Sequence, residues 1–169
     1  MVAGAPRAAG PHQGPCHRPE RRRRRTVNRV VRFFTEGVPA PEGSHKYVGY
    51  RGGRPVVAHD NPRLAEWRTI VARDAAAAAR AAGWAPQHNG PVAVQAHFYL
   101  PRPKRPRFPD HAATKPDLDK LARAVGDALA APGGILLEDS RIVTWVLTKR
   151  WASDGQPTGI HVAVTAIDD

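Results

Sequence analysis

Three aspartates in the second half of the chain have the residue type and spacing of a metal site. Asp117 and Asp119 stand two residues apart at the start of an apolar helical pattern, and Asp139 stands just before a predicted strand. Carboxylate oxygens are the ligands that Mg²⁺ and Mn²⁺ prefer in proteins. If the fold brings the three together, they would hold a divalent ion, which can activate water for hydrolysis.

The geometry of a helix limits how Asp117 and Asp119 can meet. Each helical residue turns by about 100°, so the two side chains would point about 200° apart if both were helical. They converge only if Asp117 precedes the first turn, which Pro116 favours because its fixed φ suits an extended residue or the first helical position. A helix packed on the sheet could then bring Asp139 back beside the helix start. An ordinary helix cap at Asp117 and an ordinary turn at residues 138–140 remain the alternative.

The charge of the chain favours a polyanionic partner. There are 26 Lys and Arg against 15 Asp and Glu, a formal net charge of +11. Each basic residue that neutralises a phosphate releases condensed counterions, so nucleic acid is the leading candidate. Carboxylates that hold a metal within such a basic surface are typical of a metal-dependent nuclease, in which the ion promotes attack of water on a phosphodiester.

The first 26 residues differ from the rest. Residues 1–25 contain seven arginines, five of them at 21–25, and one acid, which gives +6, while the remaining 144 residues hold 19 bases and 14 acids. Because large apolar side chains are scarce there, we expect residues 1–26 to be a disordered basic arm and residues 27–169 to form one nuclease domain. The arginine run could grip DNA, act as a localisation signal, or be a translated leader without a role. The only cysteine, Cys16, lies in this arm and allows no disulfide within the chain.

Residues 101–114 form a basic, proline-rich loop. We expect it to contact DNA phosphates and to stay mobile until DNA arrives, although charge alone fits a merely solvated loop equally well. Further basic residues outside this loop are expected to add contacts. The predicted DNA-binding residues are Lys46, Arg102, Lys104, Arg105, Arg107, Lys115 and Lys120.

Hydrophobic periodicity predicts an α+β fold, a single domain in which one mixed β-sheet packs with two main helices. Alternation along residues 141–151 places Val143, Trp145, Leu147 and Trp151 on one face. Pro132 is expected to end the second predicted helix, because proline disfavours continuation of a helix. The predicted strands cover residues 30–34, 47–50, 55–58, 92–100, 141–151 and 159–167, and the predicted helices cover residues 61–83 and 118–129.

No window of the sequence reaches the roughly 18 apolar residues of a membrane span, and no apolar signal segment follows the N-terminus. We therefore expect no membrane association. A cytoplasmic, nucleoid-associated location fits a DNA-binding protein with one cysteine.

The region from residue 115 to 151 resembles the RusA family of Holliday junction resolvases. Its members have a Lys/Arg-x-Asp-Leu/Ile-Asp-Asn run that opens an Ala- and Leu-rich helix, then Asp-Ala-Leu, a Gly turn, Asp-Asp-Ser/Ala-x-Ile/Val, and a strand ending near Lys-x-Trp. The matching segments are residues 115–119 (KPDLD), 127–129 (DAL), 138–143 (EDSRIV) and 149–151 (KRW). A weaker similarity to a Pro-x-Pro-x-Gly-Ser run lies at residues 39–44.

The resemblance implies that Asp117, Asp119 and Asp139 are catalytic residues that bind Mg²⁺, with Mn²⁺ as the alternative ion. It also implies a homodimer that makes paired nicks across four-way DNA junctions, in recombination and repair. The fold implied is RusA-like.

Two positions depart from the family pattern. Lys120 stands where the family has Asn, and Arg123 stands where the family has a catalytically important Lys. An arginine can stabilise phosphate charge but cannot donate or accept a proton near neutral pH. If the family lysine acts by charge alone, Arg123 could take its catalytic role; otherwise Lys120 would have to reach the site, or activity would be weakened.

Two other functions compete with the nuclease. Haloacid dehalogenase-like phosphatases also use Asp-x-Asp, but after an apolar parallel strand, and residues 112–116 are not such a strand. The stronger alternative is a non-catalytic accessory protein of a mobile element that binds junctions or other DNA and has lost turnover through the Lys-to-Arg change.

Overall fold

Four segments of alternating apolar residues form one mixed sheet in the computed structural model, which describes residues 1, 30–43, 45–59 and 61–168. The strand order is β1-β6-β4-β5, with β6 antiparallel to both β1 and β4, and β4 parallel to β5. The predicted arm lies outside the described residues, apart from Met1. The strands are β1 (Val30–Glu36), β4 (Val92–Leu100), β5 (Ile142–Trp151) and β6 (Gly159–Ala166).

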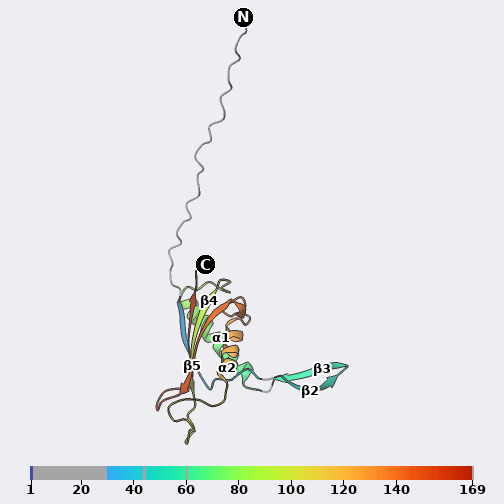
Figure 1. Ribbon diagram of the computed structural model, residues 1–169, viewed down its shortest axis with the longest axis vertical. Helices are drawn as coiled ribbons and strands as arrows, with labels where there is room; N and C mark the ends of the chain where they lie inside the picture. The colour runs from blue at the N-terminus through green and yellow to red at the C-terminus, as the bar shows by residue number, and fades with distance from the viewer. Residues whose placement is uncertain (2–29, 44, 60, 169) are drawn as a thin grey trace.

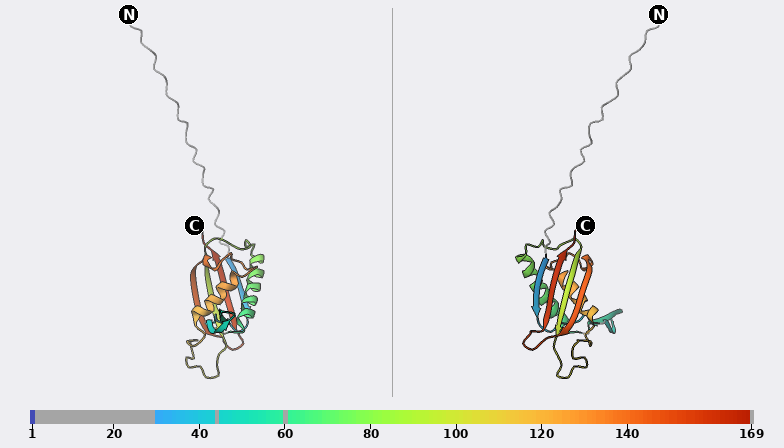
Figure 2. Two further views of the ribbon diagram at one scale, coloured as in Figure 1. Left: turned by 90° about the vertical axis from the view of Figure 1, so that its right-hand side faces the viewer. Right: turned by 60° about the vertical axis from the view of Figure 1, so that its left-hand side comes forward.

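Two helices, α1 (Leu64–Ala81) and α2 (Leu118–Leu129), cover one face of this sheet, and no helix of the described residues lies on the other face (Figure 2). Helix α1 buries residues spaced three and four apart, such as Trp67, Val71 and Ala75, and α2 buries Leu121 and Val125 in the same way. These side chains pack with the sheet in one core. The predicted α+β fold, with a mixed sheet and two main helices, is confirmed.

The connection from β4 to β5 passes through α2, as a parallel strand pair requires a crossover. Since α2 runs back along the sheet, its start lies by the ends of β4 and β5 and its second half lies by the start of β5. A short 3₁₀ turn, Asp139–Arg141, leads into β5. This path decides where the predicted site residues lie.

The pattern predicted for β5 is wrong at one residue. Trp145, Leu147 and Trp151 face the helices as expected, but Val143 is 60% exposed. The register shows why: Val92 pairs with Ile142 and Ala93 pairs with Thr144, so Val143 is the extra residue of a β-bulge. Ile142 takes the place in the core that alternation assigned to Val143.

A second, two-stranded sheet consists of β2 (His45–Arg51) and β3 (Arg54–His59), joined at Gly52-Gly53 where both glycines have positive φ. Only glycine adopts such a conformation readily, which confirms the predicted hairpin turn. Figure 1 shows the hairpin projecting sideways from the body of the molecule.

Candidate active site

The first turn of α2 places Asp117 and Asp119 at different surfaces. Asp117 is the residue before the helix, with an extended backbone (φ −70°, ψ 141°), as the sequence predicted. The Lys115–Pro116 peptide bond that precedes it is cis. The Asp117 carboxylate lies 3.8 Å from the Lys120 ammonium, within the exposed first turn.

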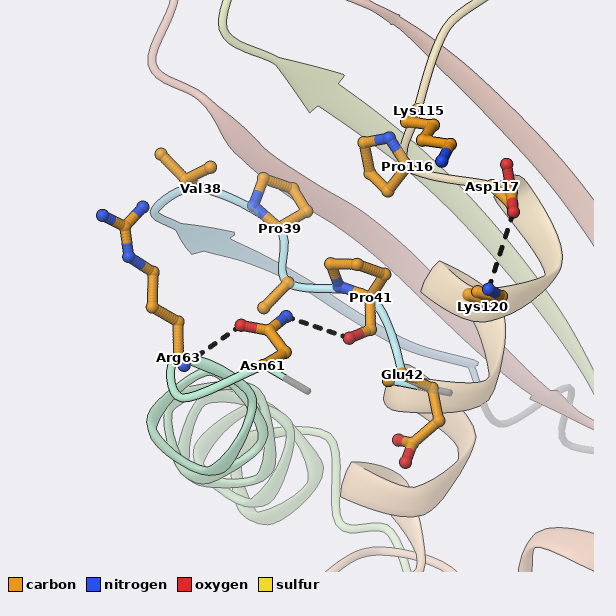
Figure 3. A pocket seen from close by; sticks show the side chains of 12 residues that line it. Val38, Pro39, Pro41, Glu42, Asn61, Arg63, Lys115, Pro116, Asp117 and Lys120 are labelled. Atoms are coloured by element: carbon orange, nitrogen blue, oxygen red, sulfur yellow. Dashed lines mark hydrogen bonds and ion pairs between the residues drawn. The ribbon is translucent and has the colours of Figure 1, made fainter. Parts of the chain in front are cut away.

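Asp117 and Lys120 line a pocket of about 580 Å³ between the start of α2 and the segment before the hairpin (Figure 3). Lys115 and Arg63 contribute further basic groups to the same pocket. Asn61 holds the facing wall through two hydrogen bonds. Its side-chain amide donates to the Pro41 carbonyl (3.0 Å), and its side-chain oxygen accepts from the Arg63 backbone N–H (3.1 Å). We call this space the basic pocket.

Asp119 and Asp139 line a second pocket, of about 350 Å³, which lies between α2 and β5. Arg123 lines it between them, one helical turn beyond Asp119. Trp145 and Leu147 of β5 contribute an apolar wall. We call this space the carboxylate pocket.

Asp139 does not lie at the helix start, contrary to the expectation from the sequence. A Cβ placed on Gly126 would lie 3.9 Å from the Asp139 Cβ, so Asp139 is beside the second half of α2. Asp119 is seven residues earlier, roughly 10 Å along the helix axis. The parallel crossover is the reason, because it returns the start of β5 to the end of α2.

Among the described residues, no group of three or more His, Cys, Asp or Glu side chains is arranged to hold a metal ion. The carboxylate pocket nevertheless offers suitable donors in Asp119 and Asp139. Mg²⁺ keeps several waters and is commonly bound through one or two carboxylates plus substrate phosphates. Asp119 and Asp139 therefore supply oxygen donors of the kind that such an ion takes, and Asp117 would join them only if its side chain left Lys120.

A part-buried ionic network lies close to Asp139. Arg68 of α1 pairs with both Glu42, which is 7% exposed, and Asp127 of α2. Burial raises the pKa of the Asp127 carboxyl above its usual range; the charge of Arg68 opposes this, and the charges of Glu42 and Asp139 reinforce it. The network fixes α1 to α2 and places a further carboxylate next to Asp139.

Only one member of this network is marked by a pattern in the sequence. Asp119, Arg123 and Asp127 follow each other at four-residue steps, which places Asp127 on the stripe of the site residues. Glu42 and Arg68 are 85 and 59 residues away from Asp127, and no local pattern joins them. Glu138, next to Asp139, accepts one hydrogen bond from the Ser140 hydroxyl (3.0 Å), and its carboxylate lies 3.4 Å from the Arg141 guanidinium, so it is engaged within the turn.

The predicted DNA-binding residues occupy two places. Arg102, Lys104, Arg105 and Arg107 are exposed on the loop that follows β4, and Lys115 and Lys120 line the basic pocket. The backbone of Lys46 lies in β2, and its side chain lies outside the described part of the structure.

Side chains of β5 hold the second half of the same loop. Trp151 donates from its indole nitrogen to the Phe108 carbonyl (2.9 Å), and Lys149 donates to the carbonyls of Thr114 (2.6 Å) and Pro116 (2.7 Å). Ala112, between these points, is buried. The four predicted basic contacts therefore precede an anchored segment that leads straight into Asp117.

No helix in the described residues is long and apolar enough to cross a membrane. No curated protein matches the chain. Residues 36–165 match the protein family described as Endodeoxyribonuclease RusA, a span that runs from the end of β1 to the end of β6 and includes both pockets. The chain therefore belongs to the RusA family of endodeoxyribonucleases, which act on Holliday junctions.

Proposed function

We propose that this protein is a Mg²⁺-dependent endodeoxyribonuclease that resolves four-way DNA junctions by paired hydrolysis of phosphodiester bonds. The observation that supports it most is that Asp119, Asp139 and Arg123 line one open pocket in a chain of net charge +11. Mn²⁺ would serve in place of Mg²⁺, since both ions prefer oxygen donors.

Each group has a role in this proposal. Asp119 and Asp139 hold the ion, and Asp117 joins when substrate or metal draws it from Lys120. A bound divalent ion lowers the pKa of a water nucleophile and offsets charge on the leaving oxygen. Arg123 stabilises the negative charge that gathers on the phosphoryl oxygens, and it needs no proton transfer to do so.

The basic groups would guide the DNA strand across these pockets. The scissile phosphate lies over the carboxylate pocket, and the neighbouring phosphates contact Lys115 and Lys120 of the basic pocket. Arg102, Lys104, Arg105 and Arg107 contact a more distant stretch of backbone. Such contacts position the duplex without reading its sequence.

The proposal includes a homodimer, because one chain has one carboxylate pocket and paired nicks need two. It also places the protein in recombination and repair, close to the nucleoid in the cytoplasm. Mass measurement in solution, with and without junction DNA, tests the dimer: a species of two chains is expected, and a monomer that cuts both strands would contradict it.

Cleavage of a synthetic four-way junction, compared with a linear duplex, tests the activity. Wild type should nick the junction in Mg²⁺ and not in EDTA, and D119N should abolish cleavage while keeping junction affinity equal or higher, because anionic repulsion falls. D154N is the matched control: Asp154 lies exposed in the turn between β5 and β6 and lines neither pocket. A wild type that binds junctions but never cuts them in Mg²⁺ or Mn²⁺ would make the non-catalytic accessory protein the better description.

A further inference from the structure

Lys149 is a charged residue on the helix-covered face of β5, where its neighbours on that face, Leu147 and Trp151, are apolar. Its ammonium group is part-buried and donates to the carbonyl oxygens of Thr114 and Pro116. Both oxygens belong to the four residues that precede α2. The Lys149 side chain therefore connects the sheet to the short segment that leads into Asp117 and Asp119.

The chemistry of an ammonium group suits this arrangement. It has three donors and no acceptor, so one group can bind two carbonyls that are two residues apart. Bonds from a charged donor are shorter and stronger than neutral ones, and the distances of 2.6 and 2.7 Å agree with this. A side chain of equal length without charge could fill the same space but would leave both carbonyls without this donor.

The position of the two carbonyls links Lys149 to the metal ligands. The Pro116 carbonyl belongs to the peptide group that begins Asp117, and the Asp117 carbonyl in turn accepts the first helical hydrogen bond, from the Leu121 N–H (3.2 Å). Fixing Pro116 thus fixes where the helix begins and how Asp119 faces the carboxylate pocket. Residues that orient metal ligands in this indirect way matter strongly for affinity.

We infer that Lys149 is a positioning residue: it sets the carboxylates of Asp117 and Asp119 for the divalent ion by holding the backbone that carries them. The inference rests on the proposed function, since it concerns the same metal site. Lys149 touches neither the ion nor the scissile phosphate in this role.

Arg150 provides a matched control. It is the next residue of the same strand, it carries the same charge, and its side chain lies on the other face of the sheet, with its guanidinium 5.7 Å from the centroid of the Tyr99 ring. K149M and R150M therefore remove equal charge from adjacent positions. Only K149M removes the two bonds to the loop.

The direct test measures Mn²⁺ binding to the DNA-free protein, with electron paramagnetic resonance of the free ion as the readout. K149M should raise the dissociation constant for Mn²⁺ about tenfold or more, and the Mg²⁺ concentration for half-maximal cleavage by a similar factor. R150M should change neither. K149R, which keeps charged donors, should recover most of the affinity, and metal-free junction binding should differ little between K149M and R150M.

A merely structural role predicts something else. K149M would then melt at a lower temperature but, where folded, would bind Mn²⁺ like wild type, and that result would overturn the inference. If K149M does not fold, K149Q offers an uncharged amide on a side chain one atom shorter, so it loses both charge-assisted bonds, and unchanged Mn²⁺ affinity in K149Q would overturn the inference equally. A wild type that neither binds Mn²⁺ nor cuts junctions would instead overturn the proposed function, so the two failures are distinguishable.

Discussion

Asp117 and Asp119 are separated by one residue, yet they line different pockets. The extended backbone at Asp117 would allow both carboxylates to approach one ion, but Lys120 lies 3.8 Å from the Asp117 carboxylate. Exposed ion pairs of this kind contribute only about 0–1 kcal/mol. A divalent ion with bound substrate can therefore compete with Lys120 for Asp117, at some cost in metal affinity.

This cost leads to the first residue-scale prediction. K120N restores the family's residue and removes the competing cation, so we expect the half-saturating Mg²⁺ concentration for cleavage to fall by about two- to fivefold, as a pair worth up to about 1 kcal/mol would allow. K120R, which retains the charge, is the control and should behave like wild type. An unchanged Mg²⁺ requirement in K120N would mean that Lys120 does not hold Asp117 away from the ion.

Arg123 lines the carboxylate pocket together with Asp119 and Asp139. If it acts by charge alone, R123K should retain cleavage within about tenfold of wild type, and R123A should lose about 10²–10³-fold, as when a transition-state donor is removed. Because lysine can lose its proton at alkaline pH and arginine cannot, only R123K should gain an alkaline fall in its pH–rate profile. An R123A variant as active as wild type would contradict this role.

For helices and strands, hydrophobic periodicity was sufficient to predict the bounds wherever the element buries a continuous stripe of apolar side chains. The strand at residues 92–100 and the helix at residues 118–129 have the predicted extent, and the strand predicted at residues 159–167 ends one residue earlier, because each buries regularly spaced apolar residues. Val143 was assigned wrongly because a β-bulge adds one residue, which alternation cannot anticipate.

The site was predictable only in part, for a related reason. The carboxylates and Arg123 could be found because they stand in a local motif, and Asp119, Arg123 and Asp139 do line one pocket. The place of Asp139 beside Gly126 depends on the parallel pairing of β4 with β5. The bonds of Lys149 and the pairing of Arg68 with Glu42 and Asp127 join residues 26 to 59 positions apart, and only the folded chain specifies such partners.

The β2–β3 hairpin gives the element-scale prediction. It projects from the body (Figure 1), the residues that flank it, Gly43 and Asn61, line the basic pocket, and residues 45–59 contain three Lys or Arg and no acid. An isolated hairpin is marginally stable in water, and a two-stranded ribbon fits the DNA major groove. We expect the double variant R51A/R54A to weaken junction binding about tenfold at low salt, with cleavage at saturating protein unchanged.

R80A is the control for this experiment, because Arg80 is exposed in the last turn of α1. It should leave junction binding within about twofold of wild type. Should replacement of residues 46–58 by a short Gly-Ser linker convert a dimer to a monomer without lowering the affinity of each chain for DNA, the hairpin would belong to the subunit interface instead.

At the scale of the whole molecule, charge is divided between two parts. Residues 1–25 hold seven Arg and one acid, and the other 144 residues hold 19 bases and 14 acids, so each part is basic by itself. The second part contains both pockets and the exposed loop arginines. Binding by residues 26–169 alone should therefore coexist with a non-specific contribution from the first 25 residues.

Deletion of residues 1–25 separates these contributions. If their seven arginines contact phosphates, the slope of log affinity against log salt should become less steep by up to about six, since each contact contributes roughly −0.9, while the cleavage rate at saturating protein stays the same. Replacing the arginines at 21–25 by lysine should keep the steep slope, because counterion release depends on charge, and replacing them by glutamine should reduce it. A deletion that abolishes junction binding at every salt concentration would mean that the folded part lacks its own DNA surface, and an unchanged slope would mean that the arginines remain in solvent when DNA binds.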